Sequence, residues 1–258
     1  NMNIEKISLQ IYTARNFKPY DNILKFLSEQ GMKKVELFEV EAFPETKELL
    51  NKYEMSSPSS HIGFSTLENT KLLISNLKES NITTAIVPSP VGKPGGKFSS
   101  LFDKTEEEWN EFGKSLSSYV DIFQDNGIHL GYHNHSFEFN PLPSGKMPIE
   151  CILDHNEDLK FEIDLGWAVA GKADPIFWIK KYASKIIACH LKDFTSKDLD
   201  LIEHDSQCAI GDGFIDWKEV LSEVTKTNCN IFALEHDNPK DYKEYVTKSL
   251  QFLSSLEV

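Results

Sequence analysis

The segment IHLGYHNH at residues 128–135 decides the fold prediction, because a strand-like apolar run leads directly into a pair of histidines. Three later segments have the same form: LKFEID ends at Asp164, IIACH ends at His190 and IFALE ends at Glu235. One such run would carry little information, but four in succession place histidine and carboxylate side chains where strands end. This pattern indicates a mononuclear metal site at one end of a sheet.

The donor types in these segments predict one bound divalent metal ion. Imidazole nitrogen and carboxylate oxygen together suit Mn²⁺, Zn²⁺, Co²⁺, Fe²⁺ or Mg²⁺. No cysteine ends any of the four segments, so the pattern does not favour a thiolate site.

Strand-like and helical patterns alternate along the whole chain. Strand-like runs cover residues 4–12, 33–38, 55–61, 83–88, 127–133, 159–165, 185–191 and 229–235. Helical patterns cover residues 21–30, 45–53, 67–80, 105–126, 148–155, 175–182, 217–225 and 240–256. Eight βα units in about 250 residues predict an α/β fold, a closed (βα)8 TIM barrel, formed by a single domain over residues 1–258. An open doubly wound sheet is the alternative, but no glycine-rich nucleotide-binding motif follows the first run.

Composition gives further expectations about the class of protein. The chain has 258 residues, of which 40% are hydrophobic and 26% are charged, and this suits one α/β domain. No stretch approaches the roughly 20 apolar residues that span a bilayer, and the first ten residues lack the features of a signal segment. We therefore expect a cytoplasmic protein with no membrane partner. The four cysteines have no ligand-like spacing, so we expect reduced thiols rather than disulfides.

The charge and the long loops bear on the partners. The net charge of −13 is spread along the chain and would repel phosphate backbones, so nucleic acid is not an expected partner. A homo-oligomer is compatible with the sequence. Residues 89–103 could form a mobile lid or a solvated connection, and residues 194–216 are expected to overhang the pocket.

Six motifs along the chain resemble those of one family. They are SLQIYTAR at 8–15, YHNHSFEF at 132–139, EIDLGWAVAGKADP at 162–175, CHLKDF at 189–194, IGDGFIDW at 210–217 and LEHDNP at 234–239. The motifs and their order are similar to those of the xylose isomerase-like TIM barrels, in particular the sugar phosphate isomerase/epimerase group with a YHNH-x-FEF signature. The resemblance implies the fold, whereas the substrate stays open because isomerases, epimerases, dehydratases and other lyases share this scaffold.

The resemblance also implies that side chains at the ends of the fifth to eighth strands bind one divalent ion. Asp164, His190 and Glu235 match three of the family ligands. Many epimerases of the wider family have a glutamate at the fifth-strand position, where this chain has His133. Glu138 is the only nearby carboxylate that could replace it. Without that glutamate, a mechanism with two glutamates on opposite faces of the substrate would lack one of its bases.

Each predicted ligand has a structural alternative. Asp164 could cap the following turn, His190 could be a buried core histidine, and Glu235 could pair with a lysine at the barrel mouth. A buried carboxylate is costly unless it is paired or bound to metal, and the parallel positions of these residues favour ligation. We therefore predict four metal ligands: His133, Asp164, His190 and Glu235.

Three residues are predicted to take part in catalysis: Glu235, His135 and Lys192. His135 follows His133 by two residues and so shares its face of a strand. Lys192 has the same relation to His190. A nearby cation would favour the neutral form of Lys192, which could then donate a proton or polarise a carbonyl, whereas the alternative is an ordinary surface lysine.

Five further residues are predicted to shape the substrate pocket: His61, Trp167, Glu36, Gln10 and Glu138. The indole of Trp167 could stack on the apolar face of a sugar, or it could belong to the core.

These features together predict a divalent-metal-dependent isomerase or epimerase of a keto-sugar or related polyol, which removes a proton next to a carbonyl through an enediolate. A metal-dependent lyase or dehydratase is the second choice, and a hydrolase of oxidised glycosides could use the same groups. The net charge disfavours an endonuclease for abasic DNA, and the ligand set disfavours a noncatalytic sugar-binding barrel. No cluster of glycines and arginines forms a phosphate cradle, so we expect an unphosphorylated substrate.

Overall fold

Eight parallel strands form a closed barrel in the order β1-β10-β7-β6-β5-β4-β3-β2. The computed structural model describes residues 1–91, 98–196 and 206–258. The barrel strands are β1 Ile7–Gln10, β2 Lys34–Leu37, β3 Ser56–His61, β4 Thr84–Val87, β5 His129–His133, β6 Lys160–Asp164, β7 Ile186–Leu191 and β10 Ile231–Leu234. Each of them lies within one of the strand-like runs of the sequence, and the predicted TIM barrel is confirmed.

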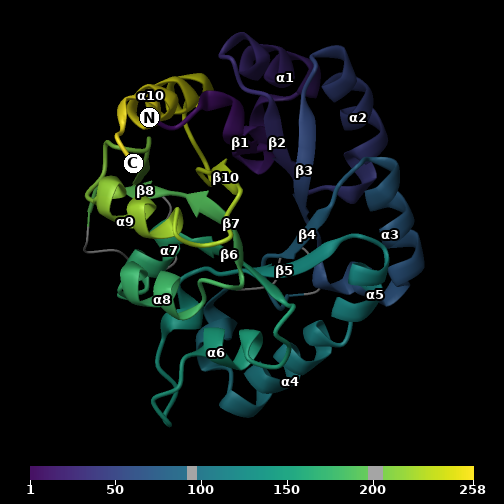
Figure 1. The fold of residues 1–258 in the computed structure, drawn as a ribbon, viewed down its shortest axis with the longest axis vertical. Coiled ribbons are helices and arrows are strands. Elements are labelled where there is room, and N and C mark those ends of the chain that lie inside the picture. Colours follow the sequence, from purple (N-terminus) through teal and green to yellow (C-terminus); the bar gives the residue numbers. More distant parts are fainter. Residues whose placement is uncertain (92–97, 197–205) are drawn as a thin grey trace.

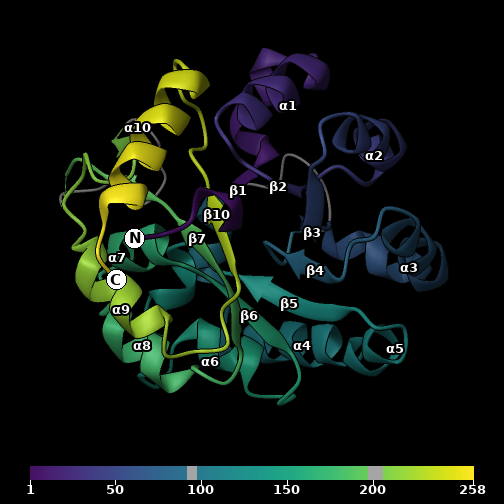
Figure 2. The same cartoon turned by 45° about the horizontal axis from the view of Figure 1, so that its top comes forward.

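The longer helices surround the ring of strands (Figures 1 and 2). The α-helices are α1 Tyr20–Glu29, α2 Phe43–Lys52, α3 Thr70–Glu79, α4 Glu106–Ser117, α5 Val120–Asp125, α6 Pro148–Leu153, α7 Leu165–Ala170, α8 Pro175–Lys181, α9 Trp217–Val224 and α10 Tyr242–Ser255. Short 3-10 helices are η1 Ile4–Lys6, η2 Ile11–Phe17, η3 Val40–Ala42, η4 Phe64–Asn69, η5 Phe98–Asp103 and η6 Phe137–Phe139. Strands β8 Asp193–Phe194 and β9 Gln207–Cys208 form a small antiparallel sheet outside the barrel.

The helices form where apolar residues recur at helical spacing. In α1 the buried residues are Tyr20, Ile23, Leu24 and Leu27, which lie on one face of the helix and pack toward the strands. At the start of α4, the Thr105 hydroxyl accepts a hydrogen bond from the Glu108 amide and satisfies a free backbone donor. Local sequence and tertiary packing therefore favour the same elements.

The prediction of one helix over residues 105–126 is wrong, because the chain breaks it into α4 and α5. At the break, the Ser118 amide is shared between the carbonyls of Lys114 at 3.0 Å and Ser115 at 3.2 Å, and the Tyr119 amide bonds to the carbonyl three residues earlier at 3.2 Å. The Ser118 hydroxyl also donates to the Ser115 carbonyl at 2.6 Å. Serine competes in this way for backbone groups and tightens the turn, so the regular α-helix ends there.

Strand residues alternate between two environments. In β6, Phe161 and Ile163 belong to the hydrophobic core between strands and helices, whereas Glu162 and Asp164 lie between them on the opposite face, inside the barrel. The interior near the carboxyl ends of the strands is therefore polar although it is fully buried. The barrel therefore has a hydrophobic layer between its strands and the surrounding helices, and a polar interior.

The strand β3 reaches this centre despite its serine-rich sequence SSPSSH. Its register with β2 shifts, since Lys34 pairs with Ser56 but Glu36 pairs with Ser59. Pro58 lies in the irregular stretch, where a residue without an N–H is tolerated. The shift brings His61, the last residue of β3, to the barrel mouth.

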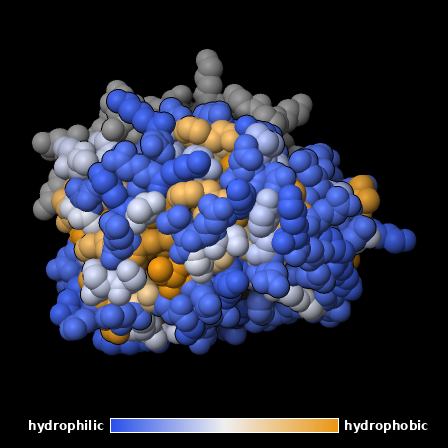
Figure 3. Space-filling model, turned by 90° about the horizontal axis from the view of Figure 1, so that it is seen from above, coloured by the Kyte–Doolittle hydropathy of each residue, from blue (hydrophilic) through white to orange (hydrophobic). Residues whose placement is uncertain are grey.

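The surface is consistent with the charged composition of the chain. Figure 3 shows a largely hydrophilic face on which hydrophobic residues gather in small patches. None of the helices in the described ranges combines the length and apolar character needed to cross a bilayer. All four cysteines are free, with Cys151 and Cys189 buried, so the expectation of unpaired thiols is confirmed.

The contact between α4 and α6 depends on Gly113. A Cβ atom at this position would overlap the carbonyl oxygen of Cys151 and would lie 2.9 Å from the Cα atom of Ile152. We expect Gly113→Ala to lower the free energy of unfolding by about 1–3 kcal/mol, because backbone atoms must move to make room. Urea denaturation measures this change, with Ser115→Ala on the exposed face of α4 as the control. Equal stabilities of the two variants would contradict the close contact.

Candidate metal centre

The alternation of side chains along four neighbouring strands brings the predicted ligands to one point. His133 ends β5, Asp164 ends β6, His190 lies in β7, and Glu235 directly follows β10. One donor atom from each residue lies within 4.8 Å of the others. In the sheet, Asp164 is paired directly with His190. The four residues therefore form one cluster at the carboxyl ends of the strands.

The spacing of the donor atoms fits a single metal ion. The Oδ2 atom of Asp164 lies 3.5 Å from His133 Nε2 and 3.9 Å from His190 Nδ1. His190 Nδ1 lies 3.4 Å from Glu235 Oε1. Four donors that each lie about 2.1 Å from one ion in a tetrahedron are about 3.4 Å apart. The observed distances are close to this value.

Two atoms of the cluster lack hydrogen bonds in the part of the chain that the structure describes. They are Asp164 Oδ2 and His190 Nδ1, and both are buried. A buried polar atom without a partner is costly, and such atoms in native structures usually bind a water molecule or an ion. A divalent cation between them would satisfy both, so the residues present fit the predicted ion.

Asp164 performs two tasks at once. Its Oδ1 atom accepts a hydrogen bond from the Trp167 amide at 2.9 Å and caps α7, as the structural alternative proposed. Its Oδ2 atom faces the cluster. Asn134 fixes the position of this residue, because its side chain accepts from the Asp164 amide at 2.8 Å and donates to the Asp164 carbonyl at 3.2 Å. The asparagine between the two histidines of the YHNH segment thus holds the ends of β5 and β6 together.

A second cluster lies directly below the first and contains His61 with the carboxylates Glu36 and Glu162. Glu162 Oε1 lies 2.7 Å from His61 Nε2 and 2.9 Å from His133 Nδ1. Glu36 Oε1 lies 2.5 Å from His190 Nε2. These are hydrogen-bond lengths and are shorter than the separations expected around an ion. The lower cluster is therefore a hydrogen-bonded support for the upper one.

The acids and bases of the lower cluster shift one another's pKa values. Burial opposes the charge of His61, but Glu36 and Glu162 outweigh it and raise the pKa of His61 to about 10. Burial acts to raise the pKa of Glu36, but His190 and His61 outweigh it and hold the pKa well below its usual range. Burial, with the charge of Glu36, raises the pKa of Glu162. For His133, burial and then the charge of His190 lower the pKa well below 6.5.

Lys192 is completely buried, so the alternative of an ordinary surface lysine is wrong. Its ammonium lies 3.0 Å from Glu235 Oε1 and 2.9 Å from Asp237 Oδ1. Burial opposes its charge, but Asp237, Glu235 and Asp164 outweigh burial and raise the pKa of Lys192. The sequence argument for a neutral lysine considered only the repulsion by a cation and missed these carboxylates.

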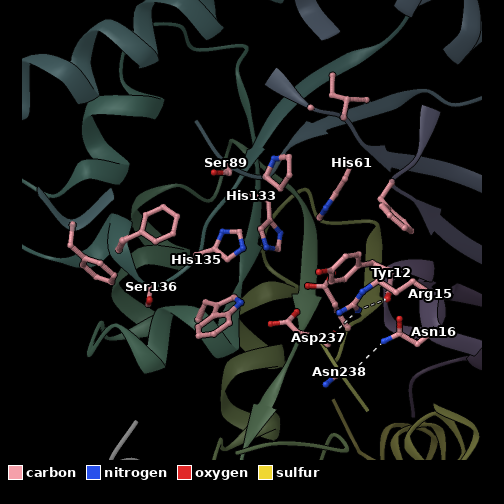
Figure 4. A pocket seen from close by; sticks show the side chains of 18 residues that line it. Tyr12, Arg15, Asn16, His61, Ser89, His133, His135, Ser136, Asp237 and Asn238 are labelled. Carbon is pink, nitrogen blue, oxygen red and sulfur yellow. Dashed lines mark hydrogen bonds between the residues drawn. The ribbon is translucent and has the colours of Figure 1, made fainter. Parts of the chain in front are cut away.

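A cavity of about 500 Å³ opens above the cluster. Five of the predicted site residues line it: His61, His133, His135, Trp167 and Glu235. Figure 4 shows the three histidines facing Tyr12, Arg15 and Asp237 across the cavity. Aromatic side chains from several loops complete the wall, namely Tyr12, Phe38, Phe102 and Phe137. A carbohydrate-sized molecule would find both apolar and polar contacts there.

Three predicted substrate contacts do not line this cavity. Gln10 and Glu36 are buried below it, where the Gln10 amide donates to Glu36 Oε1 at 2.9 Å. Glu138 is buried beside the YHNH segment, where it accepts from the Tyr132 hydroxyl at 2.6 Å and from the His135 amide at 2.9 Å. We therefore do not retain these three as substrate contacts. Because His133 faces the cluster, Glu138 is also not needed as the fifth-strand ligand.

The sequence reasoning missed several residues of the site. Glu162 and Asp237 each lie two residues from a predicted ligand, so the period of two along a strand could have identified both. Arg15 is the only arginine of the chain and lies in η2, where no regular pattern marks it. Its Nη1 atom donates to the carbonyls of Tyr12 at 2.9 Å and Asp237 at 2.5 Å. Its guanidinium lies 3.7 Å above the ring of Tyr12.

The two predicted loops reach the site only in part. Residues 92–97 and 197–205 lie outside the described residues, and of the rest of the first loop, Ser89 and Phe102 line the cavity. The described part of the second loop contributes no residue to the cavity wall. It contacts the site through Gln207, whose side chain donates a hydrogen bond to Asp237 Oδ2 at 2.7 Å. Asp193 anchors this part by accepting hydrogen bonds from the Gly211 amide and the Trp217 indole.

The profile of a protein family described as xylose isomerase-like TIM barrel matches residues 18–256. The chain belongs to the xylose isomerase-like TIM barrel family. The family resemblance inferred from the sequence motifs is thereby confirmed. Within this family the substrates and reactions differ, so the family name alone fixes the fold and not the reaction.

Individual relatives are more distant. An inosose dehydratase from Bacillus thuringiensis (strain Al Hakam) is 25% identical over 169 residues, which cover 58% of this chain and 55% of the relative. The chain thus spans about half the length of the curated relatives that it matches.

Two solved structures of this xylose isomerase-like fold are also similar. A sugar phosphate isomerase/epimerase from Parabacteroides distasonis superposes with a TM-score of 0.78 at 19% identity, covering 98% of this chain and 95% of that one. The IolI protein, solved with a zinc atom, superposes with a TM-score of 0.75 at 13% identity over 96% of each chain. At these identities the similarity shows a shared fold.

Loss of one carboxylate ligand should weaken metal binding. We expect Asp164→Asn and Glu235→Gln each to raise the dissociation constant for Zn²⁺ by more than about tenfold, because each variant removes a charged donor. Competition with a chromophoric chelator measures the constant. Asp121→Asn, at an exposed position on α5, is the control and should bind like the unchanged protein. Wild-type affinity in both ligand variants would place the ion elsewhere.

Glu138 should make stability depend on pH. Burial raises its pKa to about 8, although the Tyr132 hydroxyl and the His135 amide act in the opposite direction. Because this value exceeds the unfolded pKa of about 4.3, the contribution of Glu138 is complete below about pH 4 and is lost as pH rises toward 8. The side chain of Glu138→Gln cannot lose a proton. The free energy of unfolding of the variant, minus that of the wild type, should therefore increase between about pH 5 and pH 8. Urea denaturation at both pH values tests this, and a constant difference would contradict it.

Proposed function

We propose that the chain is a metal-dependent enzyme that removes a proton from the carbon next to a carbonyl in a polyhydroxylated keto compound such as a keto-sugar. The proposal depends above all on the four-residue donor set at the floor of the cavity, in which two buried atoms lack hydrogen bonds. The zinc atom of the similar IolI structure supports the same choice of cofactor. His133, Asp164, His190 and Glu235 would hold the ion. When bound, a divalent ion supplies Lewis-acid chemistry, which polarises a carbonyl and stabilises negative charge on oxygen.

Two groups on the cavity wall are suited to accept the proton. Burial acts to raise the pKa of Glu235, but Lys192 and His190 outweigh it and lower the pKa to about 2, so the carboxylate is ionised at neutral pH. Burial lowers the pKa of His135 to about 4, so its ring is neutral at neutral pH and one ring nitrogen carries a lone pair. When either group takes the proton, the electron pair of the C–H bond becomes the double bond of an enediolate.

The first outcome is return of the proton to carbon. Return to the neighbouring carbon gives an isomer, and return to the opposite face of the same carbon gives an epimer. His135 follows β5 and Glu235 follows β10, and both line the cavity, so they could act on different sides of a bound substrate. The similar structure described as a sugar phosphate isomerase/epimerase is consistent with this outcome.

Elimination of water is the second candidate, and the position of His133 favours it. Its Nε2 atom belongs to the donor set and its Nδ1 atom bonds to Glu162, so this residue is not free to act as a second base. Elimination needs one base and a proton for the leaving hydroxyl. The Lys192 ammonium is buried behind the cavity wall, 3.0 Å from Glu235 Oε1, so in this reaction Glu235, which lines the cavity, would pass the proton to the leaving hydroxyl. The curated relatives named inosose dehydratases agree with this reaction class.

Deuterium exchange tests the proposal. The zinc- or manganese-loaded protein is incubated in D₂O with a panel of ketoses and keto-inositols, and the products are followed by NMR and mass spectrometry. We expect deuterium at the carbon next to the carbonyl. A deuterated product with the same molecular formula as the substrate, apart from the exchanged hydrogen, would identify an isomerase or epimerase. A product whose mass is lower than that of the substrate by one water molecule would identify a dehydratase.

The controls for this experiment separate the site from the rest of the protein. Glu235→Gln should slow the reaction by at least about 100-fold, because it removes both a ligand and a base. Glu111→Gln on the exposed face of α4 should react at the wild-type rate. The absence of both exchange and elimination across the panel would overturn the proposed function.

A further inference from the structure

We propose that Glu162 is a positioning residue that sets the tautomer of His133 and, together with Glu36, that of His190, so that His133 presents Nε2 and His190 presents Nδ1 to the metal ion. This inference rests on the proposed metal centre. Glu162 was not among the residues that the sequence indicated, and it lies in the lower cluster rather than on the cavity wall.

One oxygen atom of Glu162 lies at the meeting point of three imidazole rings. Its Oε1 atom is 2.7 Å from His61 Nε2, 2.9 Å from His133 Nδ1 and 2.9 Å from His190 Nε2. The three residues come from β3, β5 and β7, and Glu162 comes from β6. The carboxylate therefore links rings that are far apart in the sequence.

The chemistry of the two groups fixes where the protons lie. An ionised carboxylate oxygen only accepts hydrogen bonds, whereas a neutral imidazole has one nitrogen that donates and one that accepts. Each ring nitrogen that faces Glu162 must then carry the proton. The opposite nitrogen keeps its lone pair, and for His133 and His190 that nitrogen faces Asp164 Oδ2 in the upper cluster. The two ligands consequently use different nitrogen atoms.

Burial strengthens the hydrogen bonds by which Glu162 fixes the histidine tautomers. Glu162, His133 and His190 are at most 1% exposed, so water competes little for these hydrogen bonds. Glu36 is also buried, and its Oε1 atom lies 2.5 Å from His190 Nε2, so it helps to hold the proton on that nitrogen, but among the described residues it pairs with His61 and His190 and not with His133. Glu162 is thus the carboxylate that contacts both histidine ligands on the side away from the ion. Carboxylates in this relation to a metal-bound histidine orient the ring and raise its basicity.

Zinc affinity tests the role of Glu162. We expect Glu162→Gln to raise the Zn²⁺ dissociation constant by about 10–100-fold, because a neutral amide no longer favours one tautomer in two rings at once. The control is Glu138→Gln, which changes another fully buried carboxyl group that touches neither ligand ring and should leave the constant within about threefold. Thermal unfolding of the metal-free variants shows whether Glu162→Gln is folded. A purely structural role would lower the melting temperature and leave the zinc affinity of the folded protein unchanged.

Imidazole NMR tests the tautomers directly and needs no variant of Glu162. Two-bond ¹H–¹⁵N spectra of the zinc-loaded wild type, labelled with ¹⁵N-histidine, should show a proton on Nδ1 of His133 and on Nε2 of His190. The opposite tautomer at either ring, or unchanged zinc affinity in folded Glu162→Gln, would overturn the inference while leaving the metal centre in place. Failure of the wild type to bind one equivalent of zinc would instead overturn the metal centre.

Discussion

The structure depends on the burial of ionisable side chains inside the barrel, which is tolerable only because acids and bases alternate there. Inside the barrel, Glu36 and Glu162 meet imidazoles, and Glu235 meets the ammonium of Lys192. An isolated charge at this depth would cost several kcal/mol, on the order of a domain's net stability. The two atoms left without hydrogen bonds, Asp164 Oδ2 and His190 Nδ1, are where a cation completes the balance.

The period of two along the strands builds the site in levels. Glu162 and Asp164 of β6 occupy successive levels, and His190 and Lys192 repeat this step at the end of β7. The lowest level supports the site, the next level offers donor atoms, and Lys192 lies above them, fully buried beside Glu235 and Asp237. A barrel provides this stacking because parallel strands deliver every second side chain to the same interior.

Much of this arrangement could be predicted from the sequence, and the failures have physical causes. The eight strands follow from strand-like runs of sequence. The four donors follow from the runs that lead into a histidine or a carboxylate, and both signals are local. Glu162 is concealed within such a run, and its importance depends on three distant histidines that only the closed barrel brings near. Gln10 and Glu36 were predicted to contact substrate, but both are buried below the cavity, and the sequence could not give this depth. The break at Ser118 depends on a side-chain hydrogen bond that hydrophobic periodicity does not contain.

The double use of Asp164 has a consequence for specificity. One carboxylate oxygen faces the ion and the other holds the first turn of α7, whose Trp167 forms part of the cavity wall. An ion of different radius would reposition the carboxylate, and the short helix with its indole would follow. In the proposed enzyme, metal selectivity and substrate selectivity would therefore be mechanically coupled, so that exchanging one metal ion for another would alter which molecules fit as well as how fast they react.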